Sequence, residues 1–207
     1  MAYDLEEQEQ LDEIKAWWKR YGTMLSYGLV AVVVAFAAFQ GWHAYQNKQS
    51  VTASTQYQAL LVTDTKDLKS IQTQAATLMD SYAGTPYAGR AALYVAKENY
   101  AAKDTKSAKL QLTWAIDHAK ETAVSALASL QLANILAEEN DFEGALKLLN
   151  AKHDEGFNGL FADLKGDVLV SLGKKAEAKT AYEEALKYLD PQGKYRTITQ
   201  QKLEALG

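Results

Sequence analysis

A long apolar stretch near the N-terminus dominates the hydrophobic pattern of the chain. No residue between Arg20 and Lys48 carries a formal charge, and residues 24–39 read MLSYGLVAVVVAFAAF. As a helix rising 1.5 Å per residue, the uncharged run spans roughly 40 Å, against about 30 Å of bilayer hydrocarbon. The pattern therefore predicts a transmembrane helix over residues 23–45, which places these residues in a lipid bilayer.

Aromatic residues flank this span on both sides, where amphipathic rings favour the two headgroup levels of a membrane. The expected membrane-interface anchors are Trp17, Trp18, Tyr21, Trp42 and Tyr45. Three cations stand close before the span, whereas Lys48 alone follows it. Because cationic flanks favour the cytoplasmic side, we expect residues 1–22 in the cytoplasm and the remainder of the chain across the membrane.

Two other interpretations of the apolar run stay open at this level. A buried core helix can be equally apolar, and Ala35-Phe36-Ala37 matches a signal-peptide cleavage pattern. However, the first 22 residues hold six acidic and three basic side chains, and signal peptides normally begin with a short basic segment. We therefore prefer an uncleaved anchor. Its acidic tail is either a solvated helix end or a small site that contacts a cytosolic partner.

Residues 46–207 show apolar positions at helical spacings of three and four, and this pattern repeats. Ala133 and Gly166 are separated by the same number of residues as Ala145 and Ala178. Ala108 and Ala145 are separated by a few residues more. These offsets are close to the roughly 34-residue period of tetratricopeptide repeats, in which small side chains let helix backbones cross closely. The predicted fold is all-α, a single transmembrane helix followed by a tetratricopeptide-repeat-like α-solenoid. A generic Ala-rich helical bundle is the alternative.

Local signals predict where individual helices begin and end. Thr85 before Pro86 and Asn140 before Glu143 are expected to cap helix N-termini, and Gly173 suits a left-handed turn. Residues 194–206 are expected to form a final capping helix. A degenerate first hairpin is expected over residues 50–82, and its predicted packing residues are Tyr57, Leu60, Leu61, Ile71, Leu78 and Met79.

Composition narrows the function classes. With 26 acidic and 22 basic side chains, the chain lacks the basic excess of a nucleic-acid binder. The absence of Cys excludes disulfides and thiolate chemistry. His153-Asp154-Glu155 has no nucleophile or metal ligand beside it in sequence, so we interpret it as a solvated turn. We therefore expect no enzyme, no catalytic residue, no metal and no cofactor.

Binding is the chemistry that remains, and the first helix of each repeat lines the concave wall in solenoids of this kind. Mapped onto the sequence, that wall runs from basic and aromatic to acidic, which could orient a partner segment. The alternative is an ordinary mixed surface without a ligand. The candidate partner-binding groove residues are Arg90, Leu93, Lys97, Tyr100, Leu130, Asn134, Glu138, Asp163 and Asp167.

Two motifs resemble a known family. Residues 87–93 read Tyr-Ala-x-x-Ala-x-Leu, and residues 155–167 contain Glu-Gly-Phe followed by Ala-Asp-Leu-Lys-Gly-Asp. With the acidic tail and the aromatic-flanked span, they resemble the ancillary SecYEG translocon subunits, the YfgM-like family, over nearly the whole chain. Asp154, Phe157, Lys165 and Asp167 depart from the family pattern, which weakens any inference of identical partner contacts.

The resemblance implies a non-catalytic, single-pass type II protein of the bacterial inner membrane with a periplasmic repeat domain. The partners it implies are the SecYEG translocon and a PpiD-type periplasmic chaperone, with nascent exported proteins as further candidates. A general adaptor for cell-envelope assembly or division complexes is the second hypothesis. A membrane-anchored enzyme is the third, and the residue inventory argues against it.

Overall fold

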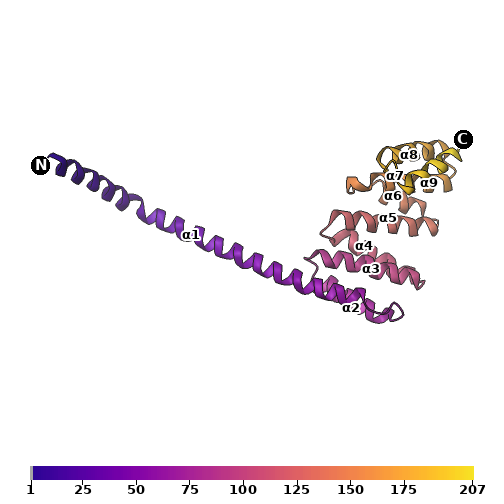
Figure 1. The fold of residues 1–207 in the computed structure, drawn as a ribbon, viewed down its shortest axis with the longest axis horizontal. Coiled ribbons are helices and arrows are strands. Elements are labelled where there is room, and N and C mark those ends of the chain that lie inside the picture. Colours follow the sequence, from indigo (N-terminus) through magenta and orange to yellow (C-terminus); the bar gives the residue numbers. More distant parts are fainter. Residues whose placement is uncertain (1) are drawn as a thin grey trace. The chain divides into compact units, whose positions relative to one another are not determined.

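The protein is built from helices throughout the part of the chain that the structure describes (Figure 1). The computed structural model describes the backbone of residues 2–207 and the side chains of residues 9–207. It divides into two compact units, Met1–Lys48 and Gln49–Gly207. The helices are α1 (Ala2–Leu61), α2 (Leu68–Ser81), α3 (Pro86–Ala101), α4 (Thr105–His118), α5 (Thr122–Glu138), α6 (Phe142–Leu149), α7 (Asn158–Ser171), α8 (Lys175–Tyr188) and α9 (Lys194–Glu204), with a short 3-10 turn η1 (Glu155–Phe157) before α7. The predicted all-α fold is therefore confirmed.

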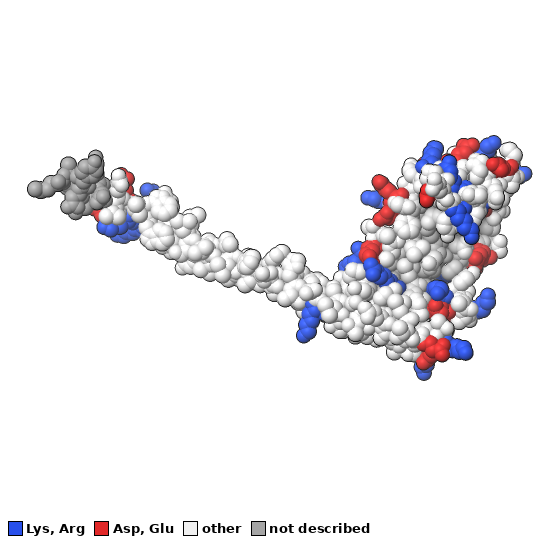
Figure 2. Space-filling view, in the orientation of Figure 1, with Lys and Arg blue, Asp and Glu red and all other residues white. Residues whose placement is uncertain are grey.

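The first unit is the uncharged part of α1 with its flanks. Within Glu9–Leu61, α1 is long and apolar enough to cross a membrane by length and composition, and only 6% of its most apolar window is buried. The large apolar side chains along it are exposed, and Figure 2 shows this stretch without charged groups. Within the described residues, this exposure differs from that of a buried core helix. The acidic residues before Glu9 lie outside the described side chains.

The second unit stacks three helical hairpins, α3/α4, α5/α6 and α7/α8, preceded by α2 and followed by α9 (Figure 1). The turn inside each hairpin has one residue in the left-handed region: Lys103 (φ 67°), Asn140 (φ 64°) and Gly173 (φ 73°). The next amide donates to a carbonyl five residues earlier in all three turns, which closes the first helix. The three left-handed residues, Lys103, Asn140 and Gly173, are separated by the same numbers of residues as Ala108, Ala145 and Ala178. The repeat register is therefore confirmed.

Two predicted caps were wrong in detail. Asn140 occupies the left-handed turn position, and the cap of α6 is the next residue, Asp141, whose carboxylate accepts from the Gly144 amide at 2.9 Å. Thr85 makes no side-chain cap for α3. Its hydroxyl instead donates to the Tyr82 carbonyl at 2.8 Å, because the chain turns back there before α3 begins. Pro86 does occupy the first turn of α3, as expected.

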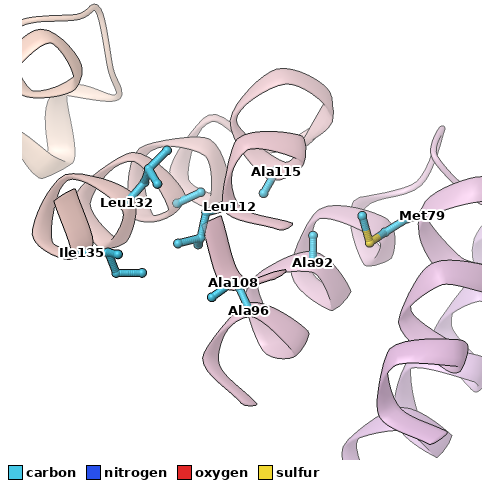
Figure 3. Close-up of a cluster of buried hydrophobic side chains, with 9 residues drawn as sticks. Met79, Ala92, Ala96, Ala108, Leu112, Ala115, Leu132 and Ile135 are labelled. Atoms are coloured by element: carbon cyan, nitrogen blue, oxygen red, sulfur yellow. The ribbon is translucent and has the colours of Figure 1, made fainter. Parts of the chain in front are cut away.

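Small residues make the helix crossings possible in this unit. Ala108, Ala145 and Ala178, the predicted equivalents in α4, α6 and α8, have no solvent exposure. Figure 3 shows the cluster around Ala108, in which side chains from α2, α3, α4 and α5 meet. A further cluster joins the end of α1 to α2 and α3 through Leu60, Ile71 and Leu78 among others. Leu61 was wrongly predicted to pack there: it is exposed, because α1 ends at this residue and the chain turns away.

Candidate functional site

Four of the nine predicted groove residues line one pocket between the first helices of the first two repeats. This α3–α5 pocket has a volume of about 320 Å³. Its floor is apolar and mostly buried, and its rim is polar, with the hydroxyl, ammonium and amide groups at the mouth. The floor residues are Ala96, Leu112, Leu130 and Ile135, and the rim residues are Lys97, Tyr100, Gln131 and Asn134.

The rim of the α3–α5 pocket is organised around the Glu138 carboxylate. The Tyr100 hydroxyl donates to its Oε2 atom, and the Asn134 amide donates to its Oε1 atom at 2.8 Å. The hydrogen bond to Glu138 raises the pKa of Tyr100, because the carboxylate accepts from the protonated phenol. Since one bond comes from α3 and the other from within α5, Glu138 fixes the polar edge of the pocket.

Lys97 is the accessible cation of this rim. Its side chain is 73% exposed, it pairs with Glu98 at 3.3 Å, and its ammonium lies 6.0 Å from the Tyr94 ring centroid. Glu98 is only 10% exposed, but the ammonium of Lys97 has three donors, so Lys97 can also bind an acceptor of a ligand. The pocket can thus hold an apolar side chain on its floor and a carbonyl or carboxylate at Lys97.

Arg90 and Leu93 have structural contacts outside the pocket lining. The Arg90 guanidinium donates twice to the Glu121 carboxylate, through Nε and Nη2, at 2.7 Å each. Because Glu121 immediately precedes α5, this bidentate pair ties the first repeat to the second, and the hydrogen bond lowers the pKa of Glu121. Leu93 is half-buried and packs against the cluster of Figure 3.

Asp163 and Asp167 face α9, which corrects their prediction as the acidic end of an open groove wall. Lys202 donates to both carboxylates, at 2.8 Å and 2.7 Å, and Thr199 donates to Asp163 at 2.7 Å. Burial alone lowers the pKa of Lys202, but its hydrogen bonds to the two carboxylates outweigh burial and the pKa is raised. The acidic end of the predicted wall is thus partly covered by α9, whose Lys202 pairs with both carboxylates.

Tyr182 completes this group from α8. Its hydroxyl donates to Asp167 at 2.8 Å, and its pKa is raised, first by burial and then by that hydrogen bond. The ring lies directly against Gly166 on α7, where a Cβ atom would come within 2.3 Å of ring carbon Cε1. The close crossing of α7 and α8 therefore depends on glycine at position 166.

The His153-Asp154-Glu155 segment is a turn with an exposed Glu155, as predicted, but His153 and Asp154 are half-buried and held by specific contacts. The His153 ring stacks on Phe161 at 3.6 Å with an interplanar angle of 8°, and its Nδ1 lies 2.8 Å from the Ala151 carbonyl. Asp154 accepts from the Thr122 hydroxyl at 2.5 Å, which is the main cause of its lowered pKa. Among the described residues, no group of three or more acidic, His or Cys residues could hold a metal ion.

The residues that sequence reasoning missed are the partners of the predicted ones. Glu121 and Lys202 were not singled out, although each forms an ion pair with a predicted site residue. Opposite charges about one repeat apart are a usable signal. Arg90 and Glu121 have this spacing, as do Lys109 and Glu139, which pair at 2.5 Å.

Comparison with known proteins agrees with the fold and with the family resemblance inferred from the sequence. A family model described as "Tetratricopeptide repeat-like domain" matches residues 15–207. Three similar proteins are each named "Ancillary SecYEG translocon subunit". The protein from Aggregatibacter actinomycetemcomitans is 30% identical over 89% of this chain and 91% of its own length. The one from Haemophilus influenzae is 28% identical over the same shares, 89% and 91%.

The third, from Escherichia coli, is 26% identical over 87% of both chains. No solved structure is significantly similar to the chain. The similarity covers both the apolar helix and the repeats, as the sequence motifs predicted. The chain belongs to the family of ancillary SecYEG translocon subunits and carries their tetratricopeptide repeat-like domain.

Proposed function

We propose that this protein is a membrane-tethered accessory of the SecYEG translocon whose α3–α5 pocket binds a segment of a partner protein. The observation that carries the proposal is the convergence of Lys97, Tyr100, Leu130 and Asn134 on one pocket with an apolar floor. The names of the relatives and the repeat fold support a translocon-associated, non-enzymatic role. The helix of Glu9–Leu61 supports membrane anchoring.

The topology that we propose is type II in the bacterial inner membrane. Residues 1–22 are cytoplasmic, residues 23–45 span the bilayer, and residues 46–207 form a periplasmic domain. The cation bias before the span supports this orientation. Paired rings lie at both ends of the span, Trp17 with Tyr21 at 5.7 Å and Trp42 with Tyr45 at 6.1 Å between centroids. These rings suit the two headgroup levels.

Protease added to spheroplasts tests this topology. We expect digestion of the repeat domain and survival of a short anchored N-terminal fragment, because only the domain faces the added protease. Inverted membrane vesicles should give the opposite pattern, with the repeat domain protected. A repeat domain that resists protease in spheroplasts and is digested in inverted vesicles reverses the orientation. A mature chain shorter by about 37 residues identifies a cleaved signal peptide instead.

The proposed partners of the pocket are a PpiD-type periplasmic chaperone and nascent exported proteins. An apolar floor with a polar rim suits an extended or helical segment, whose bulky side chain enters the floor while rim groups bind its backbone. Residues 48–207 carry 20 acidic and 19 basic side chains, so net charge does not select the partner. Local complementarity at Lys97 and Glu138 supplies the selectivity.

The double substitution Lys97→Glu with Tyr100→Ala tests the pocket. Lys97→Glu inverts the accessible charge, and Tyr100→Ala removes one wall and one donor to Glu138. We expect at least a tenfold loss in co-purification of the chaperone or crosslinking of exported chains, about 1.4 kcal/mol, with membrane insertion unchanged. Co-purification in mild detergent and crosslinking in intact membranes are the measurements.

The matched control is Lys106→Glu with Tyr195→Ala, which makes the same changes at exposed positions on α4 and α9. It should leave partner association at the wild-type level. Wild-type association in the pocket variant refutes the pocket as the binding surface and moves it to another face of the domain. Co-purification of envelope-assembly or division proteins in place of translocon chains favours the general adaptor hypothesis.

A further inference from the structure

The second helix of the middle repeat is shorter than its equivalents. Helices α4 and α8 have 14 residues each, whereas α6 has eight. Helix α4 ends at His118, and Ala145 of α6 is the equivalent of Ala108 of α4. If α6 ended at the position equivalent to His118, it would end at residue 155. Helix α8 ends at Tyr188, and its Ala178 is the equivalent of Ala145. The position in α6 that is equivalent to Tyr188 is again residue 155. The helix ends at Leu149 instead, and residues 150–157 form a loop with the turn η1.

Side-chain contacts to two helices, α5 and α7, fix this loop. Lys165 of α7 donates to the Asn150 amide oxygen at 2.7 Å, and the His153 ring stacks on Phe161. Thr122 at the start of α5 donates to Asp154 at 2.5 Å. The loop therefore acts as a rigid wall where the missing helical turns would otherwise cover α7 and α8.

A cavity of about 570 Å³ lies where these turns are missing, between α6, α7, α8 and the loop. This α6–α8 pocket shares no residue with the α3–α5 pocket. Leu149, Ala162, Leu169 and Ala181 give it an apolar floor. Residues of α8 at helical spacing, Glu177, Thr180, Glu184 and Tyr188, form its long wall.

Hydrogen-bond acceptors and a ring face define the chemistry of that wall. The side chains of Glu177 and Glu184 are 59% and 44% exposed, and each pairs with an exposed lysine three residues away, Lys174 just before α8 and Lys187 on α8. Such pairs contribute about 0–1 kcal/mol and exchange readily for another cation. Lys165, the one lysine or arginine among the described residues that line the pocket, already donates to Asn150. Tyr188 is 55% exposed and offers its ring.

We propose that the α6–α8 pocket receives an arginine side chain from an exposed segment of a partner protein. A guanidinium has five donors and no acceptor, binds a carboxylate through two parallel hydrogen bonds, and stacks on aromatic rings. In this pocket it binds Glu184 and stacks on Tyr188, while its aliphatic stem lies on Leu169 and Ala181. The cavity is larger than one side chain, so an apolar neighbour of the arginine also fits.

The test uses the full chain in nanodiscs and a short host peptide with Arg, Lys, citrulline or Leu at its centre, flanked by Leu. Citrulline keeps the shape of arginine and removes its charge. We expect the Arg peptide to bind with a Kd of about 1 mM by peptide-observed NMR, and about tenfold more tightly than the citrulline peptide. The Lys peptide should bind more weakly than the Arg peptide, because an ammonium cannot make the bidentate contact.

Glu184→Gln should abolish the preference for arginine over citrulline. Glu183→Gln, an exposed position beside it that does not line the pocket, removes the same charge and should keep the preference. Thr180→Trp, which fills the cavity from an exposed helical position, should abolish binding of the Arg peptide. Equal binding of the Arg and citrulline peptides to the wild type overturns the proposal, as does equal loss of preference in Glu183→Gln and Glu184→Gln. Failure of the Arg peptide to bind overturns it as well. These outcomes do not depend on the α3–α5 pocket.

Discussion

Replacing Gly166 with alanine is expected to destabilise the repeat domain by about 2 kcal/mol, even though alanine is the better helix former. The added Cβ would lie 2.3 Å from the Cε1 atom of Tyr182, closer than any real contact. The ring cannot move aside easily, because it is 2% exposed and its hydroxyl is bonded to Asp167. The gain in helix propensity, about 1 kcal/mol, is smaller than the cost of separating α7 from α8.

Thermal unfolding of fragment 49–207 measures this effect. A loss of about 2 kcal/mol lowers the Tm of a domain this size by roughly 4–8 °C. Gly84→Ala is the control, since a Cβ there meets nothing within 4 Å and the Tm should hardly change. In a double-mutant cycle, Tyr182→Leu should recover part of the loss by removing the ring that clashes. An unchanged Tm for Gly166→Ala, or strictly additive effects with Tyr182→Leu, would show that the crossing does not depend on this contact.

The repeat architecture could be predicted because one physical requirement recurs along the chain. Each close helix crossing needs a small residue, so Ala145, Ala178 and Gly166 recur at a spacing that the sequence alone reveals. The exact caps could not be predicted in the same way. Asn140 and Asp141 are both good capping residues, and only the left-handed turn, which favours Asn over Asp, selects Asp141 as the cap.

The candidate site was predictable where it lies inside the repeat register. Lys97, Tyr100, Leu130 and Asn134 occupy predicted wall positions on the first helices of two neighbouring repeats, α3 and α5, so they converge in the structure. The orientation of Asp163 and Asp167 depended on α9, which lies after the last full repeat and has no register to place Lys202. The spacing of opposite charges, with Lys202 35 residues after Asp167, is a signal for the ion pair, but the repeat pattern does not predict that α9 packs there.

The early end of α6 was equally hidden from the sequence pattern. Residues 150–153 contain no proline or glycine to stop a helix, and the apolar spacing of the repeat continues beyond them to Phe157 and Phe161. The loop forms through tertiary contacts, above all the stacking of His153 on Phe161 and the bond from Thr122 to Asp154. Contacts between segments about one repeat apart do not appear in a local capping or periodicity signal.

Removing the anchor is expected to weaken association with the translocon by at least about 100-fold while the repeat domain still folds. The buried residues that form the hydrophobic clusters of the described chain lie within residues 53–182. The partly buried residues that pack against them extend to Leu206, so fragment 49–207 retains the core. The domain is nearly neutral and has little attraction for anionic headgroups. The span therefore contributes by raising the effective concentration of the domain beside a membrane partner.

Three exported forms separate tethering from direct contact by the span: the full chain, fragment 49–207, and a chain whose residues 23–45 are replaced by an unrelated apolar span. Circular dichroism should show a folded helical fragment, and co-purification in mild detergent measures translocon association. We expect the exchanged span to restore association, because a tether of any sequence raises the effective concentration. An inserted but non-associating chain would instead show that residues 23–45 contact the translocon directly. Equal co-purification of the untethered fragment and the full chain would show that anchoring contributes nothing to partner binding.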